Sequence, residues 1–200
     1  ISSAASDVYK RQLQTIGAFK FRGAMNSILQ LPQDIKKVLA WSSGNHAQAV
    51  AAASKITGRQ ATIVMPEDSP KAKLNGTAFW GASIIKYDRN RENREEIGKK
   101  IAKELNATII PPFDDEKVII GQGTAGIECI EQLNQINITP DIVLCCCGGG
   151  AFVIKVTSFC INSMWLQHTG PEGRWCEEFA SLRHNADRFG QNGCYHAFLS

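Results

Sequence analysis

Long apolar runs are absent from this sequence. No stretch of its 200 residues approaches the roughly 18 consecutive apolar residues that a membrane-spanning helix requires. The opening residues also lack the basic region and apolar core of a secretory signal. We therefore expect a cytoplasmic protein with no membrane partner.

Charge of one sign does not accumulate either. Lys and Arg number 22 against 19 Asp and Glu, giving a formal net charge of +3, and the basic residues are scattered among the acidic ones. A nucleic-acid surface needs a basic patch or run that can follow phosphates. The sequence therefore argues against nucleic acid as a partner.

The cysteines have no disulfide or metal-site spacing. There are seven, an odd number, and no two stand in a CxxC arrangement. Cys145, Cys146 and Cys147 are adjacent in an expected strand, where successive side chains point to opposite faces, so they cannot hold one metal together. We expect reduced thiols and identify no metal site.

Strand-like and helix-like segments alternate along most of the chain. The expected strands are 37–41, 60–65, 83–87, 108–110 and 141–147. The expected helices are 24–31, 46–55, 71–80, 91–105 and 121–133. This alternation predicts parallel strands joined by right-handed crossovers, and therefore an α/β fold that binds ligands at the carboxyl ends of its strands.

The two ends of the sequence lack such a pattern. Residues 1–12 show no apolar period, and we expect a non-native leader there. Residues 155–200 show no sustained period of either kind and form an unassigned tail.

Lys20 is the first candidate for chemistry. It lies between Phe19 and Phe21, where a loop becomes a helix. An apolar setting disfavours the ammonium form, so such a lysine can lose its proton and form a Schiff base with an aldehyde. Most lysines near a helix start are solvated surface groups, and that alternative stays open for Lys20 alone.

Two loops that follow expected strands are candidates for binding anions. Residues 42–46, Ser-Ser-Gly-Asn-His, lie where a strand gives way to a helix whose free N–H groups attract negative charge. Ser and Asn also serve as ordinary N-caps. Residues 148–151, Gly-Gly-Gly-Ala, can form a nest of N–H groups for a phosphate or simply a flexible turn, and no GxGxxG motif is present.

These three segments occur in this order with Pro-Phe-Asp-Asp at 112–115 and Gly-Gln-Gly-Thr at 121–124. Together they resemble the serine/threonine dehydratase and serine racemase family of fold-type II pyridoxal phosphate (PLP) enzymes. The resemblance runs from about residue 13 to residue 152 and stops there, as in a truncated or damaged copy.

The resemblance implies two open parallel-sheet α/β domains of the tryptophan synthase β-like type. A small domain, residues 38–112, is inserted into a large and incomplete domain formed by residues 13–37 and 113–154. The active site would lie between the two domains. The family also implies a homodimer and a possible divalent cation, whose site is not identifiable in this sequence.

The resemblance further assigns site residues. Lys20, flanked by Phe19, would hold the cofactor covalently, and Asn45 would bond its phenolic oxygen. The cofactor phosphate would be cradled by Gly148, Gly149, Gly150 and Ala151. The substrate carboxylate would be held by Ser42, Ser43, Gly44, Asn45 and His46.

The implied reaction converts L-threonine or L-serine to a 2-oxo acid and ammonia, with Lys20 removing the α-proton. In the racemases of the family, a serine at the position of Ser43 returns a proton on the opposite face, so serine racemisation is an alternative. An alternative of another class is a non-catalytic fragment, or a nucleotide-binding module that uses the glycine loop.

Overall fold

A computed structural model describes residues 14–138 and the dipeptides 145–146 and 196–197. The chain divides into two compact units, residues 1–121 and residues 122–200. Within the described residues, no helix combines the length and apolarity needed to cross a membrane.

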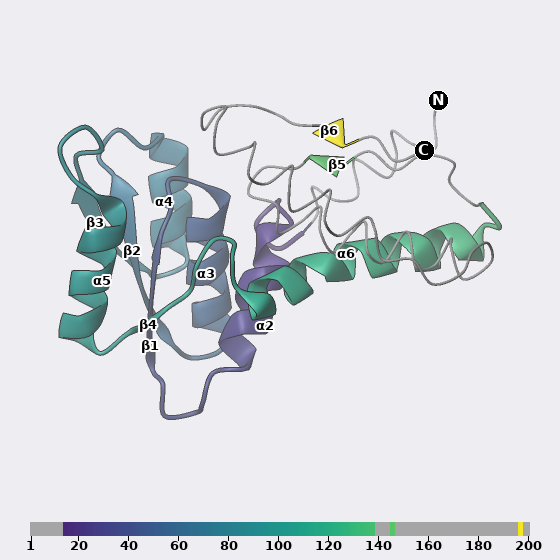
Figure 1. The fold of residues 1–200 in the computed structure, drawn as a ribbon, viewed down its shortest axis with the longest axis horizontal. Coiled ribbons are helices and arrows are strands. Elements are labelled where there is room, and N and C mark those ends of the chain that lie inside the picture. The colour runs from purple at the N-terminus through teal and green to yellow at the C-terminus, as the bar shows by residue number, and fades with distance from the viewer. Residues whose placement is uncertain (1–13, 139–144, 147–195, 198–200) are drawn as a thin grey trace, which may run out of the picture. The chain divides into compact units, whose positions relative to one another are not determined.

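The first unit is built on a parallel four-stranded sheet with the order β3-β2-β1-β4 (Figure 1). Its strands are β1 (Lys37–Trp41), β2 (Gln60–Pro66), β3 (Ser83–Tyr87) and β4 (Thr108–Ile109). The chain proceeds from β1 outward to β3 and then returns to the other side of β1. The strand order therefore reverses between β1 and β4, and ligands of open α/β sheets bind at the carboxyl ends beside such a reversal.

Helices cover both faces of this sheet. The helices of the described residues are α2 (Lys20–Leu29), α3 (Asn45–Ile56), α4 (Lys71–Phe79), α5 (Arg94–Leu105) and α6 (Glu116–Gln135), of which α3, α4 and α5 contact the strands. Helices α3 and α4 lie on one side of the sheet and α5 on the other (Figure 1). Because both faces are covered, the central strands are apolar nearly throughout instead of alternating with polar residues.

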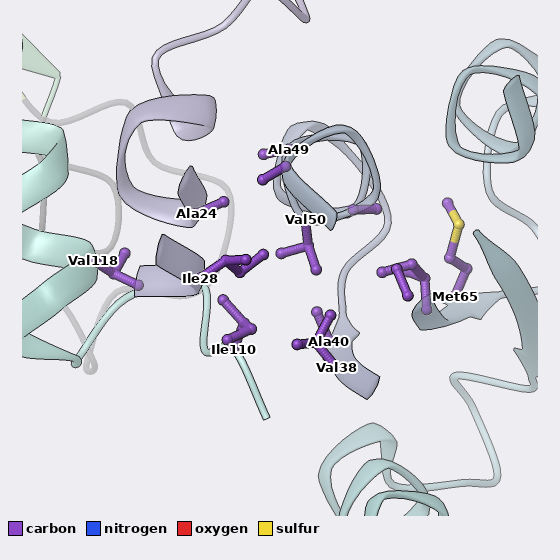
Figure 2. Close-up of a cluster of buried hydrophobic side chains, with 13 residues drawn as sticks. Ala24, Ile28, Val38, Ala40, Ala49, Val50, Met65, Ile110 and Val118 are labelled. Carbon is purple, nitrogen blue, oxygen red and sulfur yellow. The ribbon is translucent and has the colours of Figure 1, made fainter. Parts of the chain in front are cut away.

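Strand β1 divides its side chains between two apolar clusters. Val38 and Ala40 join the cluster on the α3 side, whereas Leu39 and Trp41 join the one packed by α5. Figure 2 shows the first cluster, where Ile28 of α2 meets side chains from α3 and β1. The helix that begins with the candidate lysine is thus fixed to the sheet by buried apolar contacts.

The sequence predicts most of these elements well. The predicted bounds of β1 and β3 are confirmed, and β2, β4, α3, α4 and α5 lie within a few residues of their predicted bounds. The parallel α/β class is confirmed by the four-stranded sheet.

The predicted start of helix α6 is wrong. The helix begins at Glu116, five residues before the Gly-Gln-Gly-Thr segment at 121–124. Asp115 accounts for this start, because its carboxylate accepts a hydrogen bond from the Val118 N–H at 2.9 Å and so caps the first turn. Gly121 lies inside this helix, at a point where α2 packs too closely to admit a side chain.

The second unit contains a strand pair that the sequence does not predict. Strand β5 (Cys145–Cys146) falls within the predicted strand 141–147 but pairs antiparallel with β6 (His196–Ala197). The alternating pattern predicts parallel neighbours and assigns no element to residues 155–200.

The predicted domain arrangement stays a prediction. The four-stranded sheet uses residues 37–109, which nearly all fall in the predicted small domain 38–112. Residues 1–13 and most of 139–200 lie outside the described residues, and with them the expected leader, the tail and part of the predicted large domain.

Candidate active site

Lys20 lies at the start of α2 and reaches the chain that leaves β4. Its Nζ donates a hydrogen bond to the carbonyl oxygen of Pro112 at 2.6 Å. The ammonium also lies 5.4 Å from the centroid of the Phe19 ring. The amine is therefore held at the carboxyl end of the sheet, next to the reversal of strand order.

Burial changes the acidity of this amine. Loss of hydration lowers the pKa of Lys20 to about 8, because the ammonium form is the one that water stabilises. At pH 7 about a tenth of the amine is then neutral, roughly 300-fold more than for a lysine with the usual pKa. The alternative of an ordinary solvated lysine does not fit this environment.

The loop 42–46 leaves β1 directly toward α3. The Ser42 N–H bonds the Val64 carbonyl oxygen at 3.1 Å, and the Ser42 hydroxyl accepts a bond from the Gly44 N–H at 3.2 Å. Gly44 is the N-cap of α3, and no side chain of the described residues caps this helix. The Ser and Asn side chains therefore do not cap α3, and a helix start without a side-chain cap is a place where an anion can bind.

His46 ties this helix start to the neighbouring strand. The residue is 3% exposed, and its Nε2 lies 3.0 Å from the Ile110 carbonyl oxygen. A carbonyl can only accept, so Nε2 carries the hydrogen and Nδ1 is a bare acceptor. Nδ1 is buried and has no hydrogen-bond partner among the described residues.

Burial also keeps His46 neutral. Desolvation is the main cause that lowers the pKa of His46 to about 4; the bond to Ile110 opposes it, and the charge of Lys20 adds to it. The influence of Lys20 on this imidazole indicates that the two side chains lie near each other. Both bond to the segment 110–112, which follows β4.

We expect His46 to make the fold sensitive to acid. Below pH 6.5 the unfolded chain protonates this histidine, whereas the folded chain resists until about pH 4, so the free energy of unfolding falls as pH drops through that window. The loss amounts to about 3 kcal/mol. His46→Gln keeps an amide near the Ile110 carbonyl without titrating, and urea unfolding at several pH values should give it a flatter curve. Parallel curves for the two proteins would contradict this expectation.

Asn45 has a partner that the sequence analysis missed. Its Oδ1 accepts a hydrogen bond from Lys73 Nζ at 2.6 Å. Lys73 lies in the first turn of α4. The alternating pattern alone does not give this contact, because it also requires β1 and β2 to be adjacent in the sheet, which brings the first turns of α3 and α4 to the same edge.

The remaining site predictions are not tested by the described residues. Ser43 is exposed in the loop before α3. Gly148, Gly149, Gly150 and Ala151 lie outside the described residues, so the predicted phosphate loop has no position relative to Lys20. Across the described part of the chain, no group of three or more His, Cys, Asp or Glu side chains could hold a metal.

Comparison with protein families gives a match over most of the chain. The family described as "Pyridoxal-phosphate dependent enzyme" matches residues 10–163. The match includes both Lys20 and the glycine loop at 148–151. It extends slightly further at both ends than the resemblance found in the sequence.

Two curated relatives illustrate the similarity. An L-threo-3-hydroxyaspartate ammonia-lyase from Saccharomyces cerevisiae is 47% identical over 142 residues, which cover 70% of this chain and 42% of the relative. A serine racemase from Schizosaccharomyces pombe is 45% identical over 142 residues, again 70% of this chain and 43% of the relative. The chain thus spans less than half the length of these relatives.

Solved structures agree with these relatives. The crystal structure of a threonine deaminase from T.th. superposes with a TM-score of 0.68 at 36% identity, covering 78% of this chain and 49% of that one. The structure of maize serine racemase superposes with a TM-score of 0.66, also at 36% identity, covering 78% of this chain and 46% of that one. The similarity seen in the sequence therefore extends to the fold.

Proposed function

Because the chain belongs to the family of pyridoxal-phosphate dependent enzymes, we propose that it carries the lysine end of a PLP site and acts in the dehydration and deamination of a small β-hydroxy amino acid. The observation that carries this proposal is the amine of Lys20. It is half-buried, has a lowered pKa and lies at the carboxyl edge of the sheet near the uncapped start of α3. The substrate class rests on the similarity to hydroxyaspartate and threonine ammonia-lyases.

The described residues fit the cofactor. An aldehyde needs a neutral amine, and Lys20 supplies one near neutral pH. We propose that Lys20 and Phe19 contact the cofactor and that Asn45 bonds its phenolic oxygen. The phosphate is assigned by resemblance to Gly148, Gly149, Gly150 and Ala151.

When bound, PLP supplies an aldehyde that takes up the substrate amine and a ring that withdraws electrons from the α-carbon. The residues of this chain would move the proton and bind the substrate carboxylate. The Lys20 amine would take the α-proton, and the Pro112 carbonyl, which accepts its hydrogen bond at 2.6 Å, would hold the amine in place. The substrate carboxylate is held at the first turn of α3 by Ser42, Ser43, Gly44, Asn45 and His46.

The overall reaction is balanced without an oxidant or reductant. The β-hydroxyl and the α-proton leave as water, which converts the amino acid to an enamine. Hydrolysis of this enamine consumes one water and releases the 2-oxo acid and ammonia. Serine yields pyruvate and threonine yields 2-oxobutyrate. Lys20 is the proposed base of this sequence.

Serine racemisation is the second candidate. Ser43 in the loop before α3 is the residue that the resemblance assigns to the opposite face of the substrate, and a serine racemase is among the relatives at 45% identity. A proton returned by Ser43 would give D-serine instead of a 2-oxo acid. Both activities would use Lys20 to remove the α-proton. They differ in the next event, which is loss of the β-hydroxyl in the dehydratase and return of a proton to the α-carbon in the racemase.

One assay separates these possibilities. The full chain is incubated with PLP and L-serine, L-threonine or L-threo-3-hydroxyaspartate, and 2-oxo acid, ammonia and D-serine are quantified. A dehydratase releases 2-oxo acid and ammonia in equal amounts, whereas a racemase accumulates D-serine. A folded chain that binds PLP but forms none of these products would favour the non-catalytic fragment over both enzymes.

The rate at which the chain captures PLP should depend on pH in a defined way. Capture requires the neutral amine, so the rate should rise about tenfold per pH unit up to pH 8 and level off above it. Stopped-flow absorbance at several pH values measures this rate. A rate that keeps rising to pH 10 would show that the capturing amine is an ordinary exposed lysine.

A further inference from the structure

We propose that Lys73 is a positioning residue that sets the orientation of the Asn45 carboxamide, so that the Asn45 NH2 group is directed to the phenolic oxygen of the cofactor. This inference rests on the proposed function, because Asn45 matters to the reaction only if PLP binds. It adds a residue of α4 to a site that the sequence predicts from Lys20 and the segments 42–46 and 148–151.

The contact selects one orientation of the Asn45 carboxamide, although Asn45 is exposed to solvent. An ammonium group has three donors and no acceptor, so the atom of Asn45 that faces Lys73 at 2.6 Å must be the oxygen. The NH2 group of the same planar amide then points away from Lys73 and remains a donor. Within residues 14–138, the Asn45 carboxamide is hydrogen-bonded to Lys73. Without this bond, the amide group could rotate by half a turn and exchange the positions of its oxygen and nitrogen.

The position of Lys73 is itself determined by its helix. Its backbone N–H bonds the Pro70 carbonyl at 2.8 Å, and its own carbonyl accepts the hydroxyl of the fully buried Thr77 at 2.9 Å. The lysine stem therefore leaves a firmly held first turn of α4. Its ammonium can reach Asn45 without ordering a loop.

Close packing of α3 and α4 brings the two side chains within reach. A Cβ placed on Gly76 would lie 2.8 Å from Oε1 of Gln48. Gln48 follows Asn45 by three residues, and Gly76 follows Lys73 by three. The two contacts therefore lie one helical turn apart along neighbouring helices. Because residue 76 is a glycine, α3 and α4 can pack closely enough for Asn45 and Lys73 to form their hydrogen bond.

The expected consequence for the cofactor is electrostatic. An amide N–H that donates to a phenolic oxygen stabilises its deprotonated form. If Lys73 no longer holds the amide, the donor is present only part of the time, so PLP should bind more weakly and the phenolic group should titrate at higher pH.

Three variants of the full chain test this role. Lys73→Met keeps the length of the side chain and removes the donor, Lys73→Arg keeps a donor, and Lys71→Met removes an exposed lysine from the same helix turn. Titration with PLP, followed by visible absorbance, gives the dissociation constant and the pH midpoint of the bound cofactor. Lys73→Met should weaken binding about tenfold and raise the midpoint by about one pH unit, the scale of one charge-assisted hydrogen bond. Lys73→Arg should restore most of both values, and Lys71→Met should match the wild type.

A double-mutant cycle guards against a purely structural effect. In an Asn45→Ala background, Lys73→Met should change neither value further, because the group it positions is gone. Full additivity, or a Lys73→Met spectrum like that of the wild type, would overturn the inference. So would an unchanged spectrum with a raised KM, which would place Lys73 on the substrate.

The two levels of proposal fail differently. If the folded wild-type chain takes up no PLP, the proposed function fails and the role of Lys73 toward the cofactor fails with it. If the wild-type chain and Lys73→Met take up PLP with equal affinity and equal pH midpoints, only the present inference fails.

Discussion

Lys20→Ala is expected to abolish the visible absorbance of the PLP adduct and to lower turnover by at least about a hundredfold, since it removes both the covalent anchor and the proposed base. Absorbance after PLP addition and 2-oxo acid release measure the two effects. The loss should not come from unfolding. Replacing this lysine removes a half-buried ammonium whose charged form is disfavoured, so thermal stability should be kept or increased.

Lys36→Ala is the matched control for this experiment. Lys36 is exposed, and its recorded bond uses the backbone carbonyl, which accepts the Gln60 N–H at 2.8 Å and is retained in alanine. This variant should bind PLP as the wild type does. If Lys20→Ala kept the adduct while Lys36→Ala lost it, the assignment of the anchoring amine would be wrong.

Gly121→Ala is expected to destabilise the fold strongly, although alanine favours helix over glycine by about 1 kcal/mol. A Cβ at this position would lie 2.6 Å from the Arg22 carbonyl oxygen and 2.7 Å from the Gly23 Cα. These are backbone atoms of α2, which cannot turn aside as a side chain can. We expect a net loss of about 2 kcal/mol, measured by urea unfolding, because an overpacking cost of about 3 kcal/mol outweighs the gain in helix propensity.

The same variant should impair PLP capture, because α2 begins with Lys20 and would be pushed away from α6. Gly76→Ala is the matched control for the free energy of unfolding. It is also a helix-interior glycine, but its new Cβ would meet only the flexible end of Gln48. Its free energy of unfolding should change by less than about 1 kcal/mol. Equal losses for the two variants would show that the α2–α6 approach is not the cause.

Most of the first unit follows from its sequence for local reasons. Short apolar runs followed by turn residues indicate the strands. Apolar residues spaced one helical turn apart indicate the helices that pack on the sheet. The start of α6 could not be predicted in this way. The glycine at 121 suggests a loop when only neighbours in sequence are considered, but the structure places it in a helix at a point where α2 leaves no room for a side chain.

The environment of a candidate site residue can be predicted where it depends on adjacent residues and not where it depends on packing between distant segments. The apolar flanks of Lys20 indicate a depressed pKa, which the buried environment supports. The Lys73–Asn45 bond and the carbonyl partners of Lys20 and His46 join segments far apart in the sequence. Such pairs depend on strand order, which the alternating pattern alone does not specify.

Borohydride reduction of the PLP-treated full chain, followed by peptide mass mapping, tests the central claim most directly. Reduction makes the bond between cofactor and amine permanent, so the modified residue can be located. The account predicts one modified peptide, carrying the added mass on Lys20. Modification of other lysines with Lys20 left unmodified would contradict it.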